Sequence, residues 1–140
     1  MSFSLNEVEG TAKKAARGAG YPWGLAEEAG KAARRLCACG QDGVGELARW
    51  LEQSAPFSLT EWTLDAKTME PLKDSVCPLI AGTVILDRGQ AVRISRVARP
   101  LLVAGFANAL ARAAQQGVVL RSGNGKIVGA ANGLSVSGDI

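Results

Sequence analysis

The sequence contains no histidine among its 140 residues. Histidine is the most common general base, and it completes Ser-His-Asp and Cys-His sites as well as most zinc sites. Its absence excludes these arrangements. Long apolar runs are also missing, because no stretch approaches about 18 uninterrupted apolar residues. The most apolar run, residues 101–114, contains Asn108 and Arg112, and we therefore expect no membrane span.

Aromatic and acidic residues are both scarce in the second half of the chain. Of the seven Phe, Trp and Tyr residues, one, Phe106, lies beyond residue 75. Residues 1–75 carry 9 basic and 11 acidic side chains, whereas residues 76–140 carry 7 basic and 2 acidic. Nucleic-acid-binding domains usually have a denser basic stripe with interleaved aromatic residues, so this pattern argues against a nucleic-acid partner.

The first six residues and the number of cysteines indicate the cellular location of the protein, and the spacing of the cysteines bears on metal binding. Residues 1–6 lack the basic and apolar regions of a secretory signal, and three cysteines, an odd number, are typical of reduced thiols. We therefore expect a cytoplasmic protein. On one helix, Cys37 and Cys39 would point about 200° apart, and with Cys77 they lack the paired spacing of zinc ligands. We expect no metal and no cofactor, and interpret the cysteines as small buried hydrophobic residues.

Residues 1–53 predict three amphipathic helices with short turns. Ser4 and Glu7 form a capping box before the first helix, and Asp42 caps the third. In the second helix, Glu27 is spaced to pair with Lys31. The many alanines of the first two helices imply that their axes pack closely.

Residues 54–140 predict a mixture of strands and one helix. Residues 57–64 are typical of a strand, and residues 79–97 predict a β-hairpin because they are rich in Ile, Val and Thr around a turn at residues 87–89. Residues 118–128 predict a second hairpin. Pro100 suits the first turn of a fourth helix. That helix is so apolar that the sheet, the other helices or a second subunit must cover it.

These elements predict an α+β domain spanning residues 1–140. Three N-terminal helices would pack on a mostly antiparallel sheet, with one further buried helix between the two hairpins. Residues 1–53 form the helical part, and residues 54–140 form the mixed part.

The glycine-rich sequence SGNGK at residues 122–126 resembles a phosphate-binding loop. It does not fit the Walker pattern, because Leu120 stands where that pattern needs glycine and Ile127 where it needs Ser or Thr. Asn-Gly between two β-rich runs is a strong hairpin signal. We therefore interpret this segment as the turn of the second hairpin.

Four arginines fall within twelve residues just before Pro100: Arg88, Arg93, Arg96 and Arg99. Arginine binds carboxylates and phosphates in a bidentate manner, and helix N-termini attract anions. On a strand, however, Arg93 and Arg96 would point to opposite faces. The cluster is therefore consistent either with an anion site or with a solvated edge strand whose charges block unwanted pairing.

The turn Tyr21-Pro22-Trp23-Gly24 is the most unusual local sequence, and two glutamates follow it. Tyr21 and Trp23 could line a pocket with Glu27 and Glu28, or they could staple the first two helices together. Both interpretations stay open at this point.

The chain resembles a bacterial family, domain of unknown function 3726. The resemblance rests on SLNEVE at residues 4–9 and on KKAARGAGYPWGLAEEAG at residues 13–30, and it extends to the Asp-Gly pair at residues 42–43. VCPLIAG at residues 76–82 and RPLL at residues 99–102 are similar too. The resemblance implies a bacterial protein and assigns no catalytic residue.

We expect a non-catalytic binding or accessory protein that forms a homodimer, with no membrane partner. The alternative is a small enzyme that acts on an anionic metabolite. It would hold the anion through Arg93, Arg96 or Arg99 and use Glu27 or Glu28 as a base. Tyr21 and Trp23 would line its ligand-binding site.

Overall fold

The first three helices form where the sequence predicts them. In the computed structural model, which describes residues 3–140, they are α1 (Leu5–Gly18), α2 (Trp23–Ala38) and α3 (Gly43–Ser54). At the start of α1, the Ser4 hydroxyl accepts a hydrogen bond from the Glu7 N–H at 3.1 Å, and the Glu7 carboxylate accepts one from the Ser4 N–H at 3.4 Å. The predicted capping box is therefore present.

Small residues let these helices approach one another closely, as predicted. A Cβ atom on Gly30 of α2 would lie 2.8 Å from the Glu9 carbonyl oxygen of α1. A Cβ atom on Gly43 of α3 would collide with the Ala33 carbonyl of α2. Buried alanines fill the rest of the contact: Ala12, Ala16, Ala26, Ala29, Ala32 and Ala33.

The hairpin predicted over residues 79–97 is wrong. Residues Pro78–Arg88 form helix α5, which ends at Gly89 in the left-handed region (φ 65°), and an irregular segment follows. Proline in the first turn costs no hydrogen bond there. The β-favouring Ile, Val and Thr side chains are overruled by tertiary packing, because Gly82 lies directly against the Phe106 ring.

The strand predicted at residues 57–64 is also wrong. A single helical turn, α4 (Leu59–Trp62), replaces half of it, and Leu64 makes an isolated antiparallel bridge with Pro71. The turn places Trp62 edge-on against Trp50 of α3, with ring centroids 5.0 Å apart. Packing of the Trp62 indole against Trp50 therefore favours a helical turn over a strand at residues 59–62.

The fourth predicted helix begins at Pro100 as a short 3₁₀ turn, η1 (Pro100–Val103), and continues as α6 (Ala104–Ala114). Within the protomer, α2, α5 and the sheet pack against α6. The cover that its apolar surface requires is thus supplied without a second subunit. No helix in residues 3–140 is both long and apolar enough to cross a membrane.

Three antiparallel strands form the sheet, in the order β1 (Val118–Ser122), β2 (Gly125–Ala130) and β3 (Gly133–Ser137). The predicted second hairpin is confirmed, while β3 adds a strand that the sequence analysis did not include. Gly123 has φ 57° at the first position of the turn, and Asn124 at the second has no positive φ. This is the pattern of a type II′ turn, with glycine first rather than second.

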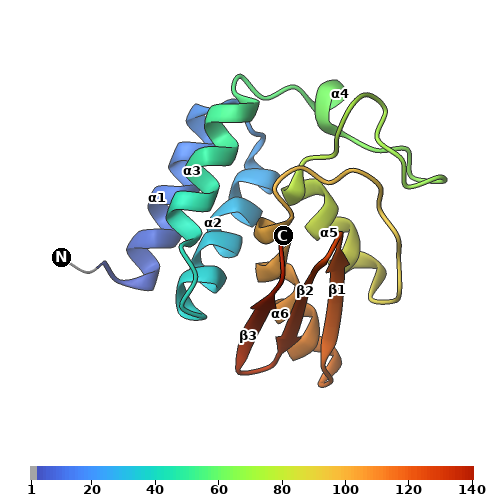
Figure 1. The fold of residues 1–140 in the computed structure, drawn as a ribbon. Helices are drawn as coiled ribbons and strands as arrows, with labels where there is room; N and C mark the ends of the chain where they lie inside the picture. Colours follow the sequence, from blue (N-terminus) through green and yellow to red (C-terminus); the bar gives the residue numbers. More distant parts are fainter. Residues whose placement is uncertain (1–2) are drawn as a thin grey trace.

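Helix α6 connects the helical part to the sheet (Figure 1). The Asn108 side chain donates a hydrogen bond to the Ala130 carbonyl of β2 at 2.7 Å. Gly129 of β2 lies so close to α6 that a Cβ atom there would be 2.7 Å from the Ala107 carbonyl oxygen. The fold is α+β, as predicted, with α6 between the first three helices and the sheet.

Candidate functional site

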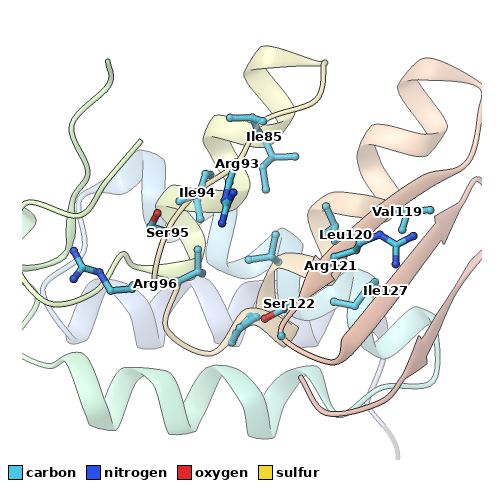
Figure 2. Close-up of a pocket in the computed structure, with 16 residues that line it drawn as sticks. Ile85, Arg93, Ile94, Ser95, Arg96, Val119, Leu120, Arg121, Ser122 and Ile127 are labelled. Carbon is cyan, nitrogen blue, oxygen red and sulfur yellow. The ribbon is translucent and has the colours of Figure 1, made fainter. Parts of the chain in front are cut away.

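A cleft of about 430 Å³ lies between the segment after α5 and the outer strand β1 (Figure 2). Residues 92–97 form one wall, and residues 119–123 form the other. Ala81 and Ile85 of α5 and Val103 of η1 line it with apolar side chains. The irregular segment that replaces the second strand of the predicted hairpin therefore forms one wall of this cleft.

Arg93 and Arg121 line this cleft from different segments. Arg93 points from the irregular segment into the opening, and Arg121 extends from β1 on the other wall (Figure 2). Both side chains are exposed, and within residues 3–140 neither makes an ion pair or a side-chain hydrogen bond. No Asp or Glu occurs between Asp87 and Asp139 in the sequence, and none lines the cleft. Arg93 and Arg121 therefore give the cleft positive charge, while Glu70, outside the lining, accepts a hydrogen bond from the Ser95 hydroxyl at 2.7 Å and offsets the charge of Arg96.

The other arginines of the predicted cluster turn to separate partners. The Arg96 guanidinium lies 4.0 Å from the Glu70 carboxylate and points away from the cleft, although its residue lines the wall (Figure 2). Arg99 donates to both carboxylate oxygens of Glu46 on α3, at 3.1–3.3 Å. Arg88 donates to a backbone carbonyl at 3.2 Å. Of the cluster, only Arg93 and Arg96 line the cleft.

Tyr21 and Trp23 separate into different environments. Tyr21 is fully buried, stacks on Phe57 with ring centroids 3.9 Å apart, and accepts a hydrogen bond from the Trp50 indole N–H at 2.6 Å. Burial, with a smaller effect from Cys77, raises the pKa of Tyr21 well above its ordinary value of 10.0. Tyr21 thus packs the helices together, and the hydrogen bond ties α3 to the loop before α2.

Trp23, by contrast, is 60% exposed at the start of α2. The Arg17 guanidinium of α1 lies 4.4 Å from its ring centroid, and the Lys13 ammonium lies 5.2 Å from it. These are cation–π contacts on the surface, and they hold α1 and α2 together from outside. Neither Tyr21 nor Trp23 lines the cleft.

The two glutamates of α2 are engaged with lysines. The Glu27 carboxylate lies 3.6 Å from the ammonium of Lys13 on α1, and the Glu28 carboxylate lies 3.8 Å from that of Lys31. The predicted Glu27–Lys31 pair is therefore replaced by these two pairs. Neither glutamate lines the cleft that contains Arg93.

The cysteines are free thiols in different settings. Cys77 is buried before α5, with its sulfur 3.3 Å from the Tyr21 hydroxyl, and burial raises the pKa of its thiol. Cys37 and Cys39 are half-buried at the end of α2, and burial raises the pKa of Cys39 as well. Within the described part of the chain, residues 3–140, no group of three His, Cys, Asp or Glu residues is placed to hold a metal ion.

Arg121 is the cleft residue that sequence reasoning missed. The alternation of residues 118–122 could have indicated it, because this pattern places Val119 and Arg121 on one face of the strand. Its position on the same cleft as Arg93 depends on how α5 and the sheet pack on α6, which no local pattern encodes.

Comparison with known proteins concerns mainly the helical part. No curated protein and no solved structure matches the chain. A family model described as "Protein of unknown function (DUF3726)" matches residues 3–76, which include α1 to α4 and end before α5. Because the match spans more than half of the 140 residues, the chain belongs to this family, DUF3726.

Proposed function

We propose that the protein is a non-catalytic binding protein and that its cleft binds the anionic groups of a ligand through Arg93 and Arg121. One observation carries this proposal: Arg93 and Arg121, which have no ion-pair partner within residues 3–140, come from separate segments and line one cleft whose lining includes no acidic residue. Guanidinium groups bind carboxylates and phosphates through paired hydrogen bonds. The positive charge of Arg93 and Arg121 would also attract such ligands.

Exposure of both arginines sets the expected strength of binding. Charges in contact with water are screened, with a Debye length of about 10 Å at 0.1 M salt. A single small anion would therefore bind weakly, and its affinity would fall as salt is added. Specificity would come from the apolar floor formed by Ala81, Ile85 and Val103.

The enzyme alternative finds less support in the geometry. It requires a base beside the anion, and the bases proposed for it, Glu27 and Glu28, pair with lysines and lie outside the cleft. General base catalysis needs the base within hydrogen-bond reach of the reacting proton. We therefore favour the binding protein over the enzyme.

A titration followed by backbone amide NMR tests the proposed anion site. Inorganic phosphate and succinate are the probes, and the signals of residues 92–97 and 119–123 are expected to shift in a saturable manner. The double variant Arg93→Gln/Arg121→Gln should weaken binding by at least about tenfold. Lys126→Gln is the matched control, because Lys126 is the cross-strand neighbour of Arg121 and does not line the cleft. Unchanged spectra at low salt, or equal losses in both variants, would contradict the proposal.

The location and assembly of the protein are also part of the proposal. We infer a bacterial, cytoplasmic protein, supported by three free thiols and by the family resemblance. The homodimer stays a prediction, although α6, which suggested it, is covered within the protomer. Native mass spectrometry of the full chain measures the assembly directly, and a monomer at micromolar concentration would contradict the homodimer.

A further inference from the structure

The outer edge of β1 carries unused main-chain hydrogen-bonding groups. In the two-residue hairpin, Ser122 and Gly125 form the closing hydrogen-bonded pair, and such pairs then alternate along the strands. The N–H and C=O groups of Val119 and Arg121 therefore point away from β2. Within residues 3–140, no other hydrogen bond uses these groups.

The opposite wall of the cleft is also an unpaired backbone segment. Residues 90–94 contain no regular structure and make no backbone hydrogen bond within the described chain. Their alternating sequence predicted the second strand of a hairpin. Because residues 78–88, which would have formed the first strand, are helical, no strand is available to pair with them. A second hollow of about 290 Å³ lies between residues 89–92 and residues 116–120, so the opening follows the whole length of β1.

The side chains around this opening differ on its two sides. Leu120 is half-buried and packs against the hydrophobic core, and Ala81, Ile85 and Val103 line the cleft with apolar groups. Arg121 lies on the exposed face of β1. A strand inserted beside β1 would alternate in the same way, with one face toward the apolar lining and the other beside the arginines.

From these observations we propose that an extended segment of a partner protein, with alternating acidic and apolar residues, pairs with the edge of β1. The inference rests on the proposed anion site and names the ligand class that would fill it. Main-chain hydrogen bonds to Val119 and Arg121 would hold the segment, while its carboxylates pair with Arg93 and Arg121. This is recognition by strand addition, in which the backbone gives affinity and alternate side chains give specificity.

The positive charge of Arg93 and Arg121 favours an acidic segment of another protein over the β1 strand of a second copy of this chain. Arg121 lies on β1 and Arg93 on the wall opposite, and no acidic residue occurs between Asp87 and Asp139 in the sequence; Glu70 contacts this wall at Ser95 and Arg96. Pairing β1 with the β1 of another copy would bring Arg93 and Arg121 of both copies together, which like-charge repulsion disfavours. An acidic strand removes this repulsion.

A capped hexapeptide of alternating Glu and Val residues is the probe, mixed with the full-length protein. It is expected to bind at least about tenfold more tightly than succinate, because main-chain hydrogen bonds add to the ion pairs. The same peptide with Lys in place of Glu should not bind. Versions N-methylated at alternate residues, one for each edge of the peptide, should include one that loses binding.

Amide hydrogen exchange locates the peptide on one edge of the sheet. The amides of Val119 and Arg121 should exchange at least about tenfold more slowly with the Glu-Val peptide present, but not with phosphate. Leu134 and Val136 are matched controls, because the register of β2 and β3 directs their main-chain groups to the opposite edge. Protection of both edges, or of neither, would overturn the inference.

The outcomes distinguish this inference from the function on which it rests. If phosphate and succinate shift the cleft signals but the Glu-Val peptide binds no better, the strand-addition inference fails and the anion site remains. If no anion binds, both fail. The variant Val119→Pro removes one outward N–H without removing a bond to β2, and it should weaken binding of the Glu-Val peptide by a larger factor than binding of succinate. The N-methylated peptides provide the same test without altering the fold.

Discussion

The charges of the helical part and those of the cleft are used differently. On α1, α2 and α3, ion pairs join neighbouring elements or successive turns, such as Lys13 with Glu27 and Arg49 with Glu46. In the cleft, Arg93 and Arg121 face solvent with no carboxylate beside them. The first arrangement adds modestly to the packing of the helices, and the second leaves charge available to a ligand. Substitutions in the helical part should therefore change stability, and substitutions in the cleft should change binding.

The largest expected effect comes from Trp50, at the centre of the helical part. Trp50 is fully buried, so Trp50→Ala should lower the free energy of unfolding by about 3–5 kcal/mol. Denaturant unfolding measures the change. Trp23→Ala is the control, because this indole is 60% exposed and its removal should cost less than about 1 kcal/mol. Equal effects of the two substitutions would contradict the assignment of Trp50 to the core.

A smaller loss is expected when the buried hydroxyl of Tyr21 is removed. Tyr21→Phe keeps the ring on Phe57 but leaves the Trp50 indole N–H without its acceptor. An unsatisfied buried donor costs about 1–3 kcal/mol, and the same unfolding measurement should show this loss. A variant as stable as the parent would mean that another acceptor replaces the hydroxyl.

Alkaline pH should weaken the helical core through Cys77 and Tyr21. Burial raises the pKa of both groups above their ordinary values of 9.0 and 10.0. Above about pH 9 the unfolded chain ionises first, so the folded state holds more protons and the free energy of unfolding falls as pH rises. Below that pH the contribution is constant. Urea unfolding between pH 7 and 11 should show this slope, and Cys77→Ala should reduce it; an unchanged slope would exclude Cys77 as its source.

The smallest effect on stability is expected in the cleft. Arg93→Gln and Arg121→Gln remove exposed side chains without ion pairs, so each should change the free energy of unfolding by less than about 0.5 kcal/mol. The same variants should lose anion binding. A loss of stability comparable to that of Tyr21→Phe would show that these arginines hold the fold, and the contrast between the two regions would then be wrong.

Local signals predicted the elements whose sequence and packing agree. The capping box at Ser4, the cap at Asp42 and the proline at residue 100 marked three helices correctly. The same proline signal stands at Pro78, but Ile, Val and Thr in the following residues favoured strands. Close packing of Gly82 against the Phe106 ring favours a helix over residues 78–88. A contact between residues 24 positions apart cannot be predicted from a local sequence pattern.

The candidate cleft was predicted in part. Arg93 and Arg96 were chosen from the sequence and line its wall, but Arg99 pairs with Glu46 on α3, 53 residues away. The sequence did not indicate Arg121 as a site residue. Arg121 and Arg93 line the same cleft only because residues 78–88 form helix α5 and leave the segment after it unpaired. The residues of a site between distant segments therefore follow from packing, not from spacing.

The placement of the three tryptophans gives the molecule separate optical reporters. Trp50 is buried, Trp62 is half-buried and Trp23 is 60% exposed, and all three precede α5. Fluorescence emission will therefore follow the helical part as it unfolds, and it will respond little to a ligand in the cleft. Iodide, drawn by Lys13 and Arg17, should quench Trp23 more strongly than the cation caesium does. One spectrum thus separates loss of the core from events at the surface.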